Sequence, residues 1–360
     1  MTGILDQRSS RAGDGLRFGL WAPIYGTWAG RTYPDESLDA GYRRNRDLLR
    51  RAEASGFSSV LLAQHVASPS SVELPVLETW TAAAALAADT ERLEIIAAVK
   101  PLLFHPGVLA KLALGIDDIS GGRFAINLVS AWFRPEMSRL GIAMPGHDER
   151  YVYSAEWLDV VRRLLRGELV HHDGPSFRID GLQLRPRSVR PDGPLVYFGG
   201  ESEPARVLAA RSADVFFING RPLPDTIELI EDLRGRPRGG PALRYGLSAF
   251  VIARPDEDEA LAELERLQAF ADLDDRSSVA AGTDPGVVMA KVAAGVPRVG
   301  SNGGTLAGLV GSYDQVADRI VAFSDAGVEL LMMQFQPLET ETARFGAEVI
   351  PRVRRLTGAA

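Results

Sequence analysis

The order of apolar and amphipathic segments constrains the fold of this chain more than any other feature. Short apolar runs rich in β-branched residues alternate with longer segments whose apolar residues recur at helical spacing. This alternation is typical of βα units around a parallel sheet. The predicted strands are residues 18–23, 59–63, 93–99, 124–129, 195–199, 214–218, 245–253 and 329–333. The predicted helices are residues 42–55, 79–88, 108–119, 153–166, 203–211, 226–234, 257–271, 313–326 and 339–356.

Eight strands in alternation with helices favour a closed barrel, because eight parallel strands complete a (β/α)8 ring. We therefore predict an α/β protein with the (β/α)8 TIM-barrel fold. The alternative is an open doubly wound sheet, which usually needs fewer strands and a Gly-x-Gly-x-x-Gly turn after the first strand. Residues 21–26 read Trp-Ala-Pro-Ile-Tyr-Gly and lack that pattern.

Two stretches depart from the simple repeat. Residues 167–194 predict an added β-hairpin with a turn at Asp180-Gly181, and we interpret residues 171–174 as a polar hairpin loop. Residues 272–304 are rich in Gly, Ala and Ser and predict a lid loop, since such long loops in compact domains are usually lids or disordered segments. We expect residues 1–16 to form a flexible leader and residues 17–360 to form a single barrel domain.

Composition excludes several classes of function. The chain has no cysteine, which excludes disulfides, thiolate metal sites and thiol nucleophiles. Its net charge of −7, with both signs interspersed, argues against a surface for nucleic acid or an anionic membrane. No apolar run is long enough to span a membrane and no secretory signal is evident, so we expect a cytoplasmic protein. We predict no metal site, because His171 and His172 lack a third ligand at suitable spacing.

Polar residues follow the fourth and fifth predicted strands, at the end of a barrel where active sites form. After the fifth strand, Gly199 and Gly200 precede Ser202 at the start of a helix. This pattern fits either an anion site at a helix N-terminus or a tight turn with Ser202 as an ordinary cap. Asn127 ends the fourth strand, so its amide needs a partner from the backbone or from a ligand. Trp132 is either a pocket wall or part of the packing.

Further polar side chains belong to the same rim. The run His-Asp-Glu-Arg-Tyr at residues 147–151 is either a charged helix start or a clamp for a phosphate. Gln64 and His65 end the second strand, and Lys100 ends the third. Together these residues indicate a site for a large, aromatic, phosphorylated cofactor that performs the chemistry while the protein positions it.

Four segments of the chain resemble the bacterial luciferase-like, flavin-dependent monooxygenases. They are residues 115–136, residues 147–151, Tyr-Phe-Gly-Gly at 197–200 with Ser202, and Gly-Leu-Val-Gly-Ser at 308–312. The resemblance runs from about residue 17 to residue 356, with the motifs in the family's order. It is strongest to the group that contains alkanesulfonate monooxygenases, dimethylsulfone monooxygenases and the pyrimidine-ring-opening oxygenase.

The resemblance implies an enzyme that uses reduced FMN, supplied by a separate NAD(P)H-dependent flavin reductase, and dioxygen to oxygenate a small molecule. It also implies a mobile lid at residues 272–304, and we expect a homo-oligomer, either a dimer or a tetramer. The candidate catalytic residues are His65, Trp132 and Asn302. The cofactor-binding positions that it implies are Gln64, His65, Asn127, Glu136, Arg150, Tyr151, Gly199, Gly200 and Ser202.

Departures from the family pattern bear on the substrate. Where alkanesulfonate enzymes carry Arg-x-His in the seventh strand, this chain has Ser248-Ala249-Phe250. The position of their lid arginine falls at Asn302. At residues 248–250, the dimethylsulfone enzymes resemble this chain more closely than the alkanesulfonate enzymes do. The resemblance therefore favours an uncharged substrate such as a sulfone over a sulfonate.

Three alternatives remain open at this point. The chain could be an alkanesulfonate monooxygenase or another FMN-dependent oxygenase that cleaves C–S or C–N bonds. It could be a deazaflavin-dependent oxidoreductase, although Glu201 and Glu203 supply few of the basic groups that a highly charged cofactor tail needs. It could also be a non-catalytic flavin-binding protein, although such a protein needs no lid.

Overall fold

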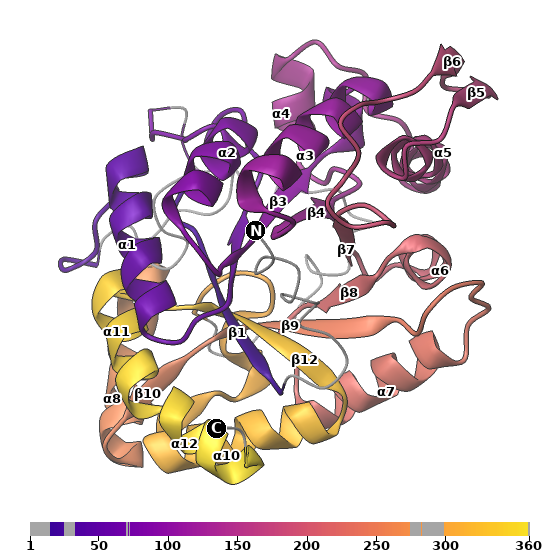
Figure 1. Cartoon of the computed structure of the whole chain (residues 1–360). Coiled ribbons are helices and arrows are strands. Elements are labelled where there is room, and N and C mark those ends of the chain that lie inside the picture. The colour runs from indigo at the N-terminus through magenta and orange to yellow at the C-terminus, as the bar shows by residue number, and fades with distance from the viewer. Residues whose placement is uncertain are drawn as a thin grey trace, which may run out of the picture.

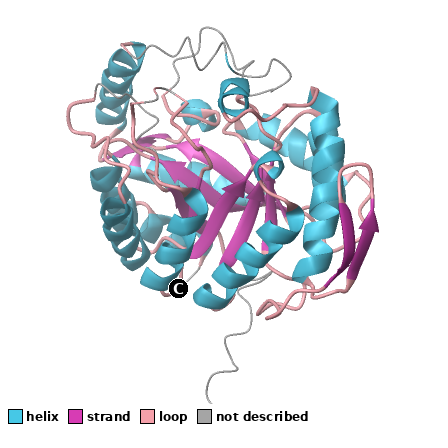
Figure 2. Cartoon of the chain, turned by 90° about the horizontal axis from the view of Figure 1, so that it is seen from above, coloured by secondary structure: helices cyan, strands magenta, loops and turns pink. Residues whose placement is uncertain are grey.

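The computed structural model describes residues 15–24, 33–69, 71, 73–273, 282 and 299–358. Eight parallel strands close into a barrel in the order β1-β12-β9-β8-β7-β4-β3-β2 (Figure 1). Figure 2 shows the strands at the centre with the helices around them. The predicted (β/α)8 TIM-barrel fold is confirmed. The barrel strands are β1 (Arg17–Trp21), β2 (Ser59–Leu62), β3 (Glu94–Val99), β4 (Phe124–Leu128), β7 (Leu195–Gly199), β8 (Val215–Ile218), β9 (Arg244–Phe250) and β12 (Val328–Gln334).

The helices pack around the barrel and begin at local capping signals. Pro106 opens α3 where its missing N–H costs nothing, and the helix ends at Gly121 with a left-handed φ of 64°. Ser312 and Gln315 form a reciprocal capping box at the start of α10. The helices are α1 (Tyr42–Ala54), α2 (Thr79–Asp89), α3 (Pro106–Ser120), α4 (Arg134–Arg139), α5 (His147–Leu165), α6 (Glu203–Ser212), α7 (Leu223–Arg234), α8 (Glu257–Asp272), α10 (Tyr313–Asp325), α11 (Leu338–Glu348) and α12 (Ile350–Thr357), with 3-10 turns η1 (Pro101–Leu103) and η3 (Gly304–Ala307).

The barrel interior is packed, and two glycines make room for its larger side chains. A Cβ on Gly19 would lie 2.8 Å from the Met332 side chain, and one on Gly246 would lie 3.0 Å from the Phe217 ring. Phe217 in turn meets Trp21 edge to face, with ring centroids 6.3 Å apart. These contacts fill the middle of the barrel below the strand ends.

A buried polar network fills the N-terminal end of the barrel. Arg17 Nη1 donates to Glu94 Oε2 at 2.9 Å, and the Tyr197 hydroxyl donates to the same oxygen at 2.7 Å. Ser59 Oγ donates to it as well, at 3.3 Å. Burial raises the pKa of Tyr197, and the neighbouring Glu94 carboxylate raises it further. The N-terminal end is therefore plugged, and the C-terminal end is left for a ligand.

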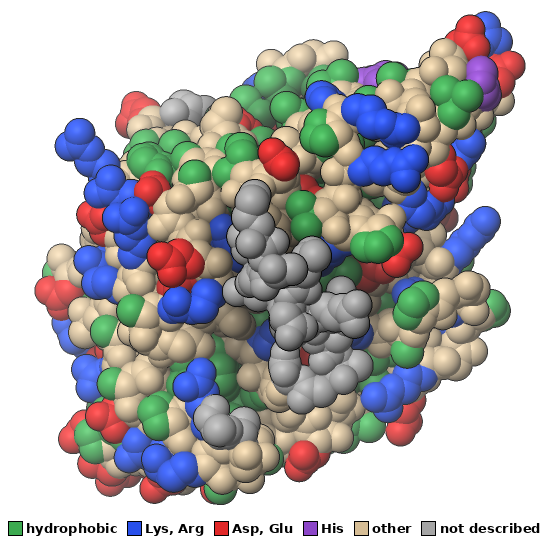
Figure 3. Space-filling model, viewed as in Figure 1, with side chains coloured by type: hydrophobic (Ala, Val, Ile, Leu, Met, Phe, Trp, Pro, Cys, Tyr) green, Lys and Arg blue, Asp and Glu red, His purple; other side chains and the backbone are tan. Residues whose placement is uncertain are grey.

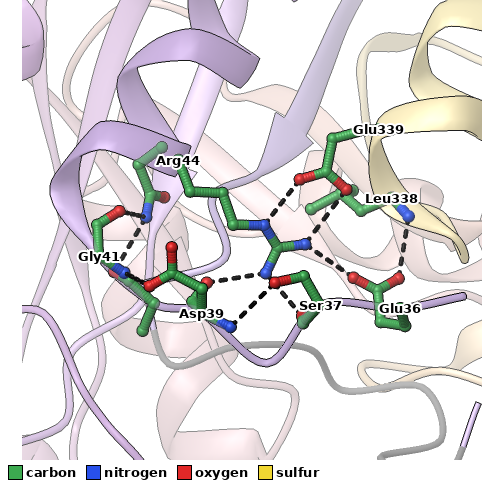
Figure 4. Close-up of polar contacts among 9 residues, drawn as sticks. Glu36, Ser37, Asp39, Gly41, Arg44, Leu338 and Glu339 are labelled. Carbon is green, nitrogen blue, oxygen red and sulfur yellow. Dashed lines mark hydrogen bonds and ion pairs between the residues drawn. The ribbon is translucent and has the colours of Figure 1, made fainter. Parts of the chain in front are cut away.

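A second ion-pair network ties the segment before α1 to the start of α11 (Figure 4). Arg44 lies between two carboxylates, with Nη2 2.7 Å from Glu36 Oε1 and Nε 2.7 Å from Glu339 Oε1. The other oxygen of Glu36 accepts the Leu338 backbone N–H at 2.9 Å. The Glu36 side chain has no exposed surface, so its charge is held entirely by these partners.

The added hairpin at residues 167–194 is present, but its predicted turn is wrong. Strand β5 (Val170–Asp173) pairs with β6 (Arg178–Leu182), so the turn lies at residues 174–177. Residues 171–173 are strand and not loop. Asp180-Gly181 lies inside β6 because Gly181, with φ 67°, forms a bulge in which two residues face one residue of β5.

Two predicted elements are divided in the structure. The seventh predicted strand, residues 245–253, separates into β9 and β10 (Ile252–Arg254), and β10 leaves the barrel to pair with β11 (Val310–Ser312). The last predicted helix, residues 339–356, separates into α11 and α12. Pro351 in the first turn of α12 has no N–H to continue the hydrogen bonds of α11.

Parts of two sequence predictions lie outside the described residues. These are residues 1–14 of the predicted leader and most of the predicted lid, of which the structure describes residues 272–273, 282 and 299–304. Within the described part of the chain, no helix is long and apolar enough to cross a membrane. Basic and acidic side chains are interspersed on the face drawn in Figure 3.

Candidate active site

The residues predicted for the site lie at the C-terminal ends of the barrel strands or directly after them. Gln64 and His65 follow β2, Lys100 follows β3, and Asn127 lies in β4. All four are buried. Strand alternation turns Lys100 and Asn127 toward the barrel axis, on the side of the interior residues of the same strands.

A buried ion pair joins β3 to the short helix α4. Lys100 Nζ donates to Glu136 Oε2, and the Val66 backbone N–H donates to Glu136 Oε1 at 2.7 Å. His65 Nδ1 lies 3.4 Å from Lys100 Nζ and 3.5 Å from Glu136 Oε1. Three ionisable side chains from three segments thus meet in one place without access to water.

Burial and mutual charge set the protonation of this cluster. Burial lowers the pKa of His65, and the neighbouring Lys100 ammonium lowers it further, to about 4. Burial alone would raise the pKa of Glu136, but His65 and Lys100 outweigh it and lower that pKa to about 2. His65 is therefore neutral at pH 7, while Glu136 is ionised and paired with Lys100.

Two other candidates position this cluster. The Gln64 side-chain oxygen accepts the Lys100 backbone N–H at 2.6 Å, which fixes the turn after β3. Trp132 meets the His65 ring edge to face, with centroids 5.9 Å apart. The structure therefore brings together Gln64, His65, Trp132 and Glu136 around Lys100.

Two buried polar atoms near the strand ends have no hydrogen-bond partner among the described residues. They are Asn127 Oδ1 in β4 and Ser248 Oγ in β9. Their residues are 5% and 0% exposed, so bulk solvent does not reach them. A buried polar group without a partner costs free energy, which makes both atoms candidates for contact with a ligand.

A second group of candidates lies where α5 and α6 begin. A Cβ on Gly200, which has φ 153°, would come within 3.5 Å of the Tyr151 hydroxyl. The His147 and Tyr151 rings lie 5.2 Å apart. Within the described part of the chain, His147 Nε2 and Ser202 Oγ are buried and without partners. Ser202 stands at the N-cap of α6, yet its side chain makes no capping bond.

Arg150 is directed differently from its neighbours on α5. Its Nε donates to the Ser130 carbonyl at 3.1 Å, and its Nη1 donates to the Pro145 carbonyl at 2.9 Å. The guanidinium thus ties α5 to the segment that follows β4. His147 belongs to the predicted anion clamp but not to the predicted cofactor-binding positions. Its Nε2, which has no partner among the described residues, lies on a ring that meets Tyr151, and only the three-dimensional structure shows this.

Asn302 lies on the other side of the barrel mouth, next to β8 and β9. Its carbonyl accepts the Gly220 N–H at 2.8 Å, and its own φ is +50°. A Cβ on Gly220 would lie 2.8 Å from the Ser248 carbonyl oxygen, so the backbone is closely packed there. Among the described residues, no hydrogen bond, ion pair or ring contact joins Asn302 to the His65 cluster.

One described residue of the predicted lid reaches the far side of the mouth. A Cβ on Gly282 would lie 2.5 Å from the Phe133 ring and 2.8 Å from the Pro135 ring. The backbone at residue 282 therefore packs against the segment that carries Trp132. Residue 282 thus lies against the start of α4, although it follows α8 in the sequence.

Two cations at the mouth are paired with carboxylates. Lys100 is bound to Glu136, and Arg221 after β8 donates to Glu201, whose side chain is 3% exposed. The Asn219 N–H also donates to Glu201, at 2.9 Å. Glu201 was not among the predicted site residues. Within residues 15–273 and 299–358, apart from their undescribed gaps, no group of three His, Asp or Glu side chains could hold a metal ion.

Comparisons with known proteins show the family to which the chain belongs. Residues 16–330 match the family described as luciferase-like monooxygenase. The chain is 32% identical over 351 residues to the FMNH(2)-dependent dimethylsulfone monooxygenase of Pseudomonas putida, a match that covers 95% of this chain and 96% of that protein. The chain therefore belongs to the luciferase-like monooxygenase family.

Solved structures share the fold. DmoA from Hyphomicrobium sulfonivorans aligns with a TM-score of 0.79 at 19% identity, covering 96% of this chain and 89% of that one. A long-chain alkane monooxygenase aligns with a TM-score of 0.81 at 20% identity, covering 96% and 92% of the two chains. A coenzyme-F420-dependent secondary alcohol dehydrogenase also aligns, with a TM-score of 0.68.

Proposed function

We propose that this protein is a reduced-FMN-dependent monooxygenase that oxygenates a small, uncharged organic molecule such as a sulfone. The observation that carries the proposal is a set of buried polar atoms at the C-terminal end of the barrel that have no partner among the described residues. They are Asn127 Oδ1, Ser248 Oγ, His147 Nε2 and Ser202 Oγ. The name of the relative in Pseudomonas putida supports both the cofactor and the substrate class.

These atoms fit the two ends of a flavin mononucleotide. Ser202, Tyr151 and His147 would hold the phosphate at the N-terminus of α6, where backbone N–H groups and the helix dipole favour an anion. Asn127, in the wall of the barrel, would contact the flavin ring. Gly200 leaves room before α6 for the ligand to approach. Gly199, at the end of β7, and Arg150, which ties α5 to the segment after β4, remain cofactor-binding candidates.

When bound, reduced FMN from an NAD(P)H-dependent reductase would supply the two electrons needed for one atom of dioxygen to enter the substrate and for the other to leave as water. The protein's own residues bind the flavin, orient the substrate and exclude water. His65, Trp132 and Gln64 form one wall of the mouth, and Asn302 lies on the opposite wall. We propose that residues 272–304 act as a lid over that space and that residues 17–360 form one domain.

The charges at the mouth support an uncharged substrate. A sulfonate needs unengaged cationic donors, because an unpaired buried charge is very costly. Lys100 is already neutralised by Glu136, Arg221 by Glu201, and His65 is neutral at pH 7. Ser248 and Phe250 add no charge from β9.

The experiment compares dimethylsulfone with methanesulfonate, which differ in size by little and in charge by one. Each is supplied with reduced FMN from a reductase and with oxygen, and substrate loss is measured beside a control without protein. We expect kcat/KM for the sulfone to exceed that for the sulfonate by at least tenfold. A preference for the sulfonate would contradict the charge argument, and turnover of neither would leave a different uncharged molecule to be found by screening.

A further inference from the structure

A third buried polar atom at the strand ends has no hydrogen-bond partner among the described residues, namely Nε1 of Trp21 at the end of β1. The indole packs against the interior apolar cluster of the barrel and meets the Phe217 ring edge to face. Two other buried indoles have their N–H groups bound, since Trp80 Nε1 and Trp157 Nε1 each donate to a backbone carbonyl, at 3.1 and 2.8 Å. Because a buried indole N–H usually finds an acceptor, the donor of Trp21 indicates a ligand at this place.

Trp21 and Ser248 lie on the same wall of the barrel. Strands β1 and β9 both pair with β12, and Gly19 and Ser248 both stand opposite Met332 in that pairing. Trp21 is the next interior residue of β1 after Gly19, because side chains alternate along a strand. Neighbouring strands are about 4.8 Å apart, so the backbones of β1 and β9 are about 10 Å apart across β12. The indole covers part of that span, so one small molecule can contact both side chains.

This wall is opposite the side on which we propose that the flavin binds. In the closed order of strands, β12 is four places from β4 in either direction around the ring. The proposed phosphate clamp lies where α5 and α6 begin, after β4 and β7, and Asn127 lies in β4. The flavin would therefore lie along β4 and β7, and the wall of β1, β12 and β9 would face the substrate.

The unpartnered atoms on the two sides differ in the kind of hydrogen bond that they make. Asn127 Oδ1 only accepts, so it needs an N–H group such as those of the flavin ring. Trp21 Nε1 only donates, and the Ser248 hydroxyl is able to donate. A sulfone has two oxygens that accept and no group that donates. It therefore matches the two donors on the wall of β1 and β9, and it does not match Asn127.

We propose that Trp21 and Ser248 recognise the two oxygens of a sulfone, one each, and thereby determine the substrate class, an assignment that rests on the proposed function. Both donors are uncharged and buried, which suits an uncharged acceptor. A sulfide has no oxygen and leaves both donors unpartnered, so this wall selects against it.

Binding tests this assignment without turnover. The protein is saturated with oxidised FMN and titrated with dimethylsulfone or with dimethylsulfide, which differ by the two oxygens. The indole 15N–1H signals are followed, and the chain has five tryptophans, of which Trp21 is the one whose signal is missing in Trp21→Phe. We expect dimethylsulfone to shift the Trp21 signal downfield, as a new hydrogen bond does, and dimethylsulfide to leave it nearly in place. Equal shifts with both ligands would contradict the assignment.

Two variants remove one donor each. Trp21→Phe keeps an aromatic ring beside Phe217 and loses the N–H, whereas Ser248→Ala loses only the hydroxyl and tests the pair even where Trp21→Phe does not fold. Each should raise the Kd for dimethylsulfone by about threefold to tenfold, the effect of one neutral hydrogen bond, as measured by calorimetry. The Kd values for dimethylsulfide and FMN should stay unchanged. Trp157→Phe, which removes an N–H that is already bound within the protein, is the matched control.

The contrary outcomes are distinct. Equal weakening of sulfone and sulfide would mean that the side chains only pack against the ligand, and a raised Kd for FMN would place their partner on the flavin. A wild type that binds no dimethylsulfone would overturn the assignment, whereas turnover of another uncharged molecule with reduced FMN would keep the proposed function. Sulfone binding that depends on both donors, without turnover, would support the assignment and contradict the proposed function.

Discussion

His147 and Arg150 lie one turn apart at the start of α5, yet their side chains have different partners. The guanidinium binds two backbone carbonyls, whereas the imidazole faces Tyr151 with Nε2 unpartnered among the described residues. Ser202 Oγ, at the start of α6, likewise has no hydrogen-bond partner among the described residues. At the residue scale, the proposed phosphate clamp therefore consists first of His147, Tyr151 and Ser202.

Ser202→Ala should weaken the binding of FMN and leave the binding of riboflavin unchanged. The lost contact is a hydrogen bond to a charged group, worth about 1.5–3 kcal/mol, so the Kd for reduced FMN should rise about tenfold or more. Quenching of tryptophan fluorescence under anaerobic conditions measures both Kd values. Ser212→Ala, at the other end of α6, is the control. An equal loss for FMN and riboflavin would place the phosphate elsewhere.

At the scale of elements, two loops meet through glycines at the mouth of the barrel. Gly303 has φ 89°, and a Cβ there would lie 2.0 Å from the Gly220 carbonyl oxygen. The loop after β8 and the segment before η3 are therefore in backbone contact, with Asn302 held between them by the Gly220 N–H.

Gly303→Ala should separate these loops and destabilise the protein by more than Gly308→Ala. Gly308 also has a left-handed φ, of 71°, but a Cβ there would meet nothing within 4 Å. Its substitution therefore costs only the backbone strain, about 1–2 kcal/mol, whereas Gly303→Ala adds the clash. Urea unfolding of the two variants measures the difference, and equal losses would mean that the loops can move apart freely.

At the scale of the whole molecule, stability should depend on the protonation of His65. Its pKa in the folded protein is lowered to about 4, below the ordinary 6.5, so the unfolded chain binds this proton more tightly. The stability that a neutral His65 contributes is present above pH 6.5 and is lost as the pH falls toward 4. His65→Gln should therefore flatten the decline in unfolding free energy between pH 7 and pH 4.5, as measured by urea melts. A decline of the same slope in both proteins would contradict this assignment.

The arrangement of the whole chain followed from its sequence more closely than the arrangement of the site. The alternation of apolar strands and amphipathic helices is a local signal, and it predicted all eight barrel strands in order. Helix α4 was missed because its six residues are too few to show a period. The pairing of Glu136 with Lys100 depends on where α4 lies, so no local pattern could predict it.

The plug of Arg17, Glu94 and Tyr197 has a consequence for the way in which ligands reach the site. These side chains close the N-terminal end of the barrel, and Trp21, Phe217 and Met332 fill its middle. Among the described residues, the interior is thus a packed core and not a pore. Every molecule that reacts at the strand ends must therefore enter and leave on that one face.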